Sequence, residues 1–220
     1  MRAGAIKCAN ANGFCTGASR RVVAEPDARR CAAAGLPTAW GEFQLQIYCD
    51  PEGREHAVLS MGTVAGEGVL TRIHSECLTG DVFASLRCDC GEQLRTALAA
   101  IAKEGQGILI YLRQEGRSIG LAKKIRAYQL QEQGFDTVDA NVELGEPKDA
   151  RTYYVARDVL ADLGTTSIRL LTNNPAKMDA MQSLGVNVVE RIPIEIEPNA
   201  INREYMRTKR EKMGHWLGQL

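Results

Sequence analysis

Apolar residues recur along the chain with two different periods, and the first part of the chain shows only the shorter one. The segments LPTAWGEFQLQIY (36–48), HAVLSMG (56–62) and GVLTRIHS (68–75) alternate apolar and polar positions, which predicts three β-strands with no helix between them. Residues 1–35 have no sustained period and are rich in Ala, Arg and Gly. We expect a mobile basic tail there, although an arginine-rich, acid-poor start is also compatible with a targeting segment.

Helix and strand patterns alternate from residue 90 onward. Helices are expected over 90–105, 121–134 and 150–164 and after a loop within 173–185, and strands over 107–112, 167–172 and 186–190. Gly105 is typical of a helix end, and the pair Asn174-Pro175 is typical of a helix start. Alternating strands and helices predict parallel strands with helices packed against them, whereas the early strands suggest an antiparallel or barrel-like part.

These patterns predict a mixed α/β (α+β) fold, with a strand-rich N-terminal part followed by alternating helices and parallel strands. Because no linker divides the later part of the chain, we expect one domain over residues 36–220. Apolar residues make up 45% of the 220 residues and charged residues 25%, which is usual for a globular domain and argues against a disordered or coiled-coil chain.

Charge and hydropathy exclude two classes of partner. The net charge is zero, so the chain has no electrostatic footprint for nucleic acid, while a few placed cations would suffice for a small phosphate ligand. The longest apolar runs, residues 97–102 and 108–112, are far shorter than the ~20 residues of a membrane span. We expect neither a nucleic-acid nor a membrane partner.

The seven cysteines are the first sign of specific chemistry. An odd number in a chain of this length argues against a secreted disulfide framework and favours a reducing cytoplasm. Cys77, Cys88 and Cys90 crowd together, which favours a metal site, whereas Cys49 fits a simple buried thiol. Three thiolates leave one position of a zinc ion open for catalysis, while His74 could close the site as a structural centre, and a cluster without metal is the third alternative.

A zinc ion with three thiolates carries a net charge of −1, so a nearby acid or base would help its water react. Glu76 and Asp89 adjoin the cysteines, and Tyr128 and Asp149 are more distant candidates. Such a centre beside a nitrogen heterocycle suggests attack on a ring carbon, as in the zinc deaminases. Their signature, H-x-E followed by P-C-x-x-C, is missing from the sequence.

The segment RIHSECLTGDVFASLRCDCGEQL (72–94) resembles GTP cyclohydrolase II, the family that opens the guanine ring of GTP in the first committed step toward riboflavin. The resemblance continues through 111–141, 171–178 and 205–215 and covers about residues 36–217. It leaves the basic N-terminal stretch unmatched. Some relatives carry an additional domain for dihydroxybutanone phosphate synthesis, which this sequence lacks, so we expect a monofunctional enzyme.

The resemblance implies a zinc ion on Cys77, Cys88 and Cys90, magnesium on the triphosphate and a homodimer. It implies catalytic roles for Tyr128 near the zinc, for Asp149 as proton acceptor, and for Arg151 as the proposed nucleophile at the α-phosphate. The GTP contacts that it implies come from Arg72, Ile73, His74, Ser75, Glu76, Gln93, Glu115, Gly116, Arg117, Thr137, Thr172 and Lys177.

Several of these residues have simpler interpretations. Asp149 precedes a predicted helix and could be only its N-cap, with Arg151 an exposed residue of the first turn. A guanidinium is protonated at neutral pH, so charge stabilisation by Arg151, with water attacking phosphorus, is the alternative to a nucleophilic arginine. Tyr128 lies on an apolar helical stripe and could serve packing alone. Lys177 follows a helix start that already favours anions, which suits a phosphate or purine ligand.

The expected reaction is hydrolysis of GTP to 2,5-diamino-6-ribosylamino-4(3H)-pyrimidinone 5′-phosphate, formate and pyrophosphate. One alternative is an enzyme that opens the ring but retains the formyl group. A second is a silent GTP-binding protein with a structural zinc. A third is the same activity in a specialised pathway that uses this pyrimidine.

Overall fold

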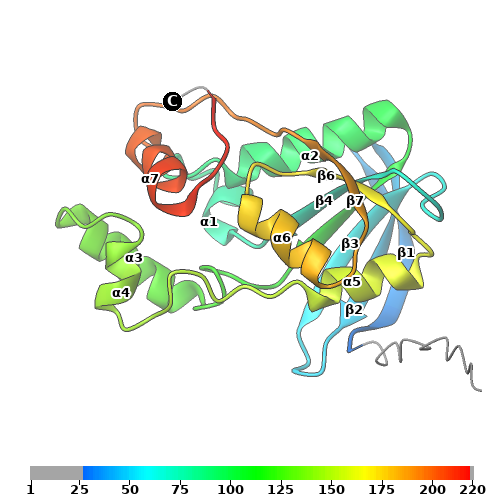
Figure 1. Ribbon diagram of the computed structural model, residues 1–220, viewed down its shortest axis with the longest axis horizontal. Helices are drawn as coiled ribbons and strands as arrows, with labels where there is room; N and C mark the ends of the chain where they lie inside the picture. The colour runs from blue at the N-terminus through cyan, green and yellow to red at the C-terminus, as the bar shows by residue number, and fades with distance from the viewer. Residues whose placement is uncertain (1–26, 219–220) are drawn as a thin grey trace, which may run out of the picture.

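The computed structural model describes residues 27–218, which form a single mixed sheet of seven strands with helices on both faces (Figure 1). The strands are β1 (Arg29–Thr38), β2 (Gly41–Cys49), β3 (Glu55–Met61), β4 (Val69–Ser75), β5 (Gly107–Leu112), β6 (Ile168–Leu171) and β7 (Val188–Ile192). The helices are α1 (Leu78–Asp81), α2 (Cys90–Glu104), α3 (Leu121–Glu132), α4 (Asp139–Glu143), α5 (Tyr154–Asp162), α6 (Pro175–Ser183) and α7 (Arg203–Met213).

The strand order is β1-β2-β3-β5-β4-β6-β7. Neighbours from β1 to β5 pair antiparallel, whereas β4 is parallel to β5 and β6, and β7 is parallel to β6. The predicted mixed α/β fold, with an antiparallel early part and a parallel later part, is therefore confirmed. The early strands join the same sheet as the later ones and do not form a separate barrel.

The N-terminal boundary differs from the prediction. Residues 36–48, expected as one strand, contain a turn at Ala39 and Trp40 between β1 and β2. The Thr38 hydroxyl stabilises this turn, because it accepts a hydrogen bond from the Trp40 amide and donates one to the Gly41 carbonyl. Since β1 begins at Arg29, the predicted tail is wrong for residues 29–35, and residues 1–26 lie outside the described part.

Cys31 and Cys49 form a disulfide between β1 and β2. The pairing register shifts between Arg30 and Ala32, so Cys31 lies at an irregularity opposite the end of β2. The interpretation of Cys49 as a free buried thiol is therefore wrong. Among the cysteines of residues 27–218 this is the one disulfide, and one bond between neighbouring strands is not the cysteine framework of a small secreted domain.

The two faces of the sheet carry separate cores. On one face Ala97 and Ile101 of α2 pack against Leu109 of β5. On the other face α5 and α6 cover a larger cluster that includes Ile73 and Ile110. The predicted helix end at Gly105 and the predicted helix start at Asn174-Pro175 are both confirmed. Gly105 ends α2 in the left-handed conformation, and the Asn174 side chain caps the first turn of α6.

The remaining helices lie beyond the sheet, on the side where β4 leads into α1 (Figure 1). We did not predict α1, α4 or α7. The first two are too short to show a period, and α7 consists mostly of charged residues. The helix expected over 150–164 begins only at Tyr154, because residues 151–153 run without regular structure. No helix within residues 27–218 has the length and apolar character needed to cross a membrane.

Candidate active site and metal centre

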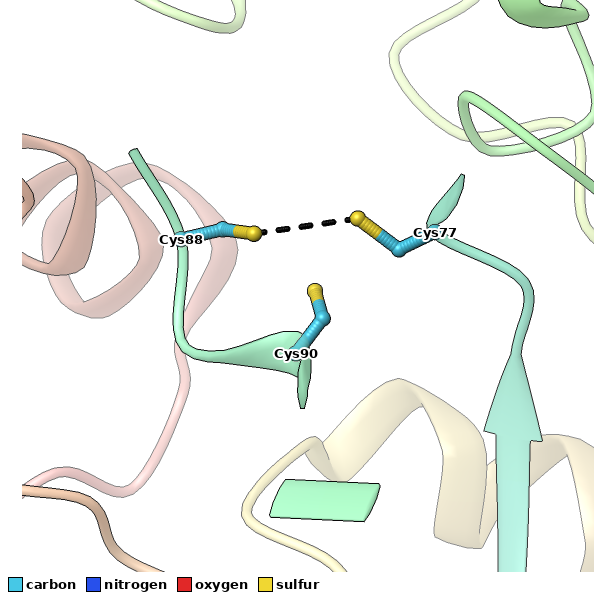
Figure 2. A group of neighbouring side chains, drawn as sticks. All are labelled: Cys77, Cys88 and Cys90. Carbon is cyan, nitrogen blue, oxygen red and sulfur yellow. Dashed lines mark hydrogen bonds between the residues drawn. The ribbon is translucent and has the colours of Figure 1, made fainter. Parts of the chain in front are cut away.

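The three clustered cysteines come together where β4 ends and α2 begins. Cys77 follows β4, while Cys88 and Cys90 flank the residue that precedes α2. Their Sγ atoms all lie within 4.8 Å of one another, and Figure 2 shows the three side chains converging on one point. This set of three soft donors fits a zinc ion, with a fourth position left for another ligand.

His74 does not complete this set. Its Nε2 atom lies 3.1 Å from the carboxylate of Asp81, which also accepts hydrogen bonds from the Cys77 amide and the Tyr111 hydroxyl. Burial lowers the pKa of His74. Because its Nε2 atom contacts Asp81 and His74 does not belong to the cluster of ligand atoms within 4.8 Å of one another, the closed site that uses His74 as a fourth ligand is disfavoured.

Two glycines allow the cysteines to approach one another. A side chain at Gly80 of α1 would place its Cβ 2.8 Å from the Cys88 Sγ atom and 3.3 Å from that of Cys77. A Cβ at Gly91 of α2 would lie 2.2 Å from the Gly80 carbonyl oxygen. The backbones of α1 and α2 thus touch directly, and this contact sets the distance between the first and last cysteines.

Charged and aromatic groups surround the cluster. Lys124 of α3 places its Nζ atom 3.1 Å from the Cys77 Sγ atom and 2.7 Å from Glu115. Tyr128 lies one turn further along α3, and its hydroxyl is 3.3 Å from that of Thr79. Tyr128 therefore lies beside the cysteines.

The cluster opens into a cavity that most of the predicted GTP-binding residues line. Of these residues, the walls include Arg72, His74, Ser75, Glu76, Gln93, Glu115, Gly116, Arg117, Thr137, Thr172 and Lys177, together with Tyr128 and Arg151. Ile73 and Asp149 do not line it. The Ile73 side chain is buried in the core, and its backbone carbonyl accepts a hydrogen bond from Lys177. Asp149 accepts a hydrogen bond from Arg151, which does line the cavity.

Residues 113–120, the loop after β5, contribute one wall in a strained conformation. Arg117 and Ser118 have positive φ angles of 61° and 72°, which are costly for residues with a side chain. Gly116 also has a positive φ, and a Cβ there would lie 2.9 Å from the Gly120 carbonyl. This tight turn holds Arg117 at the cavity.

The cations of the cavity differ in their partners. Lys177 is buried and donates a hydrogen bond to the Ile73 carbonyl at 2.6 Å. Burial, followed by the charges of Arg72 and Arg151, lowers its pKa well below the usual value. Among the described residues neither Lys177 nor Arg117 forms an ion pair with a carboxylate. Both are thus available to an anionic ligand.

Several buried polar atoms in the cavity walls have no hydrogen-bond partner within residues 27–218. They are the Arg72 Nε, His74 Nδ1, Thr137 Oγ1 and His215 Nδ1 atoms. Leaving such a group unsatisfied costs about 1–3 kcal/mol, so native proteins usually pair it. Their concentration in one cavity indicates that a polar ligand completes the site.

The helix α7 and the segment that follows it supply a wall with no residue predicted from the sequence. Tyr205, Lys209, Met213 and His215 line the cavity. Lys209 forms an ion pair at 2.6 Å with Asp89, the buried residue between two of the cysteines. Asp89 was a candidate acid or base, but here it holds α7 against the cysteine loop. The sequence signal for these residues is the 205–215 motif, from which no individual site residue is predicted.

Comparison with known proteins identifies relatives over most of the chain. The model of the family described as GTP cyclohydrolase II matches residues 29–193. A GTP cyclohydrolase-2 of Pseudomonas aeruginosa (strain LESB58) is 56% identical over 191 residues, which cover 86% of this chain and 93% of that protein. A GTP cyclohydrolase-2 of Neisseria gonorrhoeae (strain ATCC 700825 / FA 1090) is 51% identical over 189 residues, covering 86% and 96%. The riboflavin biosynthesis protein RibBA of Chlorobium phaeovibrioides is 52% identical over 191 residues, which cover 86% of this chain and 47% of that longer protein.

Proposed function

The chain belongs to the GTP cyclohydrolase II family, as its motifs predicted, and we propose that it hydrolyses GTP to 2,5-diamino-6-ribosylamino-4(3H)-pyrimidinone 5′-phosphate, formate and pyrophosphate. The family is one of hydrolases in riboflavin biosynthesis. The observation that carries the proposal is a cluster of three thiols that opens into a cavity lined by unpaired cations and unsatisfied polar atoms.

The proposed reaction needs two metals. Cys77, Cys88 and Cys90 would hold zinc, which when bound supplies Lewis-acid activation of water for opening the imidazole ring of guanine. We propose that magnesium binds mainly through the phosphates of GTP. This assignment agrees with the protein side, because the cysteine cluster is the only group of three or more metal-ligating side chains found within residues 27–218.

The residues of the cavity divide between the two ends of the nucleotide. Lys177, Arg117 and Arg151 would bind the triphosphate, because all three face the cavity. Within residues 27–218 Lys177 and Arg117 form no ion pair with a carboxylate, and Arg151 is oriented by its ion pair with Asp149. Thr137, Thr172 and Gln93 offer neutral donors and acceptors for the base and ribose. Tyr128, near the thiols, is placed to move or hold a proton at the opening ring.

We further propose that Arg151 acts through its charge. Burial opposes ionisation, but hydrogen bonds to Asp149 outweigh it and raise the pKa of Arg151. A guanidinium held in the protonated form is a poor nucleophile and a good clamp for two phosphate oxygens. Water attack at phosphorus beside Arg151 therefore fits this site better than attack by the arginine.

The predicted homodimer is also a proposal. Val82, Phe83 and Leu86 follow α1 with exposed side chains, and Leu121 and Ile125 of α3 are exposed too, which leaves apolar surface for a second copy of the chain. Light scattering on the purified protein would test it, and a single chain at micromolar concentration would contradict it. We propose the cytoplasm as the location, because the three thiols must stay reduced to bind metal.

Incubation with GTP, magnesium and zinc, followed by mass analysis of the products, tests the function. Formate, pyrophosphate and the diaminopyrimidine phosphate should appear in equal amounts. A product that retains the formyl group would identify the incomplete reaction. Unchanged GTP, in the presence of bound zinc, would leave only nucleotide binding.

A further inference from the structure

One largely buried cation directly contacts a sulfur of the proposed metal site. Lys124 of α3 places its Nζ atom 3.1 Å from the Cys77 Sγ atom, and its side chain is only 11% exposed. This distance is that of a hydrogen bond from an ammonium group to a thiolate.

The carboxylate of Glu115 holds Lys124 in this position. Glu115 accepts a hydrogen bond from the Lys124 Nζ atom at 2.7 Å. Glu115 is itself fixed by the backbone amides of Gly116 at 2.8 Å and Leu78 at 2.7 Å. Leu78 directly follows Cys77, so the carboxylate links the strained loop after β5, α3 and the first cysteine. Three protein donors therefore engage this carboxylate, two at Oε1 and one at Oε2.

Charge arithmetic gives this contact a chemical consequence. A divalent ion with three thiolates has a net charge of −1 in a mostly buried setting. A hydrogen bond from an ammonium group withdraws electron density from the thiolate, which then donates less to the metal. The metal thereby keeps more of its positive charge, which is what activation of water requires.

We propose that Lys124 is a positioning residue for the metal centre, which orients Cys77 and offsets the negative charge of the three thiolates, with Glu115 holding it in place. The inference rests on the proposed function only in so far as the three cysteines bind a metal. It changes the expected role of Glu115 from a GTP contact to a support of the metal site.

Cobalt(II) in place of zinc tests the inference by spectroscopy, because cobalt bound to thiolate has a sulfur-to-metal charge-transfer absorption. In Lys124→Met the thiolate of Cys77 loses its donor, so this absorption should move to lower energy. Cys77 also loses the contact that orients its sulfur, and this loss should outweigh the stronger donation by the thiolate. The affinity for cobalt and zinc should therefore fall about 10–100-fold, as is typical for loss of a group that orients a metal ligand. In the zinc enzyme kcat should fall more than KM rises.

Matched variants separate this role from general stability. Lys124→Arg keeps the charge and should shift the absorption least, while Lys124→Gln keeps a neutral donor and should be intermediate. Lys123→Met is the control. Lys123 lies beside Lys124 on α3, but it forms an ion pair with Glu146 at 2.6 Å, so this variant should leave the spectrum unchanged. Should Lys124→Met fail to fold, the arginine and glutamine variants decide.

The two proposals fail in different ways. A wild-type protein that shows no cobalt–thiolate absorption would overturn the metal site itself. A wild-type absorption that stays at the same energy in the folded variants of Lys124, with unchanged metal affinity, would overturn the role of Lys124 and leave the metal site intact.

Discussion

Arg151 and Asp149 form a two-point ion pair, with the Arg151 Nε atom 2.8 Å from one carboxylate oxygen and the Nη2 atom 2.5 Å from the other. Although burial raises the pKa of Asp149, the hydrogen bonds from Arg151 lower it overall. The same contacts keep Arg151 charged. This geometry supports the proposal that Arg151 acts as an oriented guanidinium charge rather than as a nucleophile.

Replacement of Arg151 tests this arrangement. Arg151→Ala should reduce pyrophosphate release by about 100–1000-fold, which is usual when one group that stabilises transition-state charge is lost. Arg151→Lys should recover only part of this loss, because lysine lacks the planar fork that binds two oxygens. Pyrophosphate assays on both variants provide the measurement, and full activity of the lysine variant would reduce Arg151 to a generic charge.

Lys177 should contribute to binding more than to chemistry. It is buried, faces the cavity and forms no ion pair with a carboxylate of residues 27–218, so a phosphate oxygen would be its first anionic contact. Lys177→Ala should therefore raise KM for GTP by about tenfold or more while kcat changes less. Steady-state kinetics measures this, and an unchanged KM would exclude Lys177 from the GTP site.

Gly80 should be essential for the metal site although it carries no chemistry. In Gly80→Ala the new methyl group would lie 2.8 Å from the Cys88 Sγ atom, so either the sulfur or the helix must move. We expect a loss of about 1–3 kcal/mol of stability and a clear drop in bound zinc. Gly35→Ala in β1 is the control, because its nearest neighbour would be 3.9 Å away. Zinc content equal to that of the wild type would contradict this account of the cluster.

The pH dependence of stability should carry a signature of His215. Burial, with Lys209 and Arg151 nearby, lowers its pKa from 6.5 to about 4. Between these values the unfolded chain binds more protons than the folded one, so stability is complete above about pH 6.5 and falls as the pH drops toward 4. The slope from this residue is at most about 1.4 kcal/mol per pH unit.

Urea unfolding of the metal-free protein at about pH 7 and pH 5.5 measures this slope. His215→Asn should flatten the dependence without abolishing it, because burial also lowers the pKa of His56 and His74. An identical slope in the variant would show that His215 does not titrate in this range.

Local signals in the sequence predicted the parts of the fold that depend on local chemistry. Gly105 and the Asn174-Pro175 pair marked helix ends correctly, because capping is satisfied within a few residues. The turn at Ala39 and Trp40 was missed because alternation continues through it, and no glycine or proline pair marks the reversal.

In the candidate site, too, features set by local sequence could be predicted and features set by tertiary packing could not. The spacing of Cys77, Cys88 and Cys90 predicted their convergence, which the structure shows. The partners of the cluster could not be predicted in the same way. Lys124 and Lys209 are ordinary helix residues by sequence, and only the packing of α3 and α7 beside the cysteine loop turns them toward sulfur and Asp89.

Replacement of Cys88 by Ser should separate ring opening from cleavage of the triphosphate. Ring opening needs the metal that the three thiols hold, and serine is a poor ligand for it at neutral pH. Arg151 and Lys177 lie on other segments of the cavity and do not depend on that metal for their contacts. Cys88→Ser should therefore lose zinc and formate production together, yet still release pyrophosphate slowly and convert GTP to GMP.

Circular dichroism must first confirm folding of this variant, because metal binding contributes to stability. A folded, zinc-free variant that still makes formate would exclude a catalytic role for the cluster. Loss of both products would mean instead that the metal also organises the phosphate side of the cavity, which Arg72 would explain, since it joins β4 to Gln93 at the start of α2.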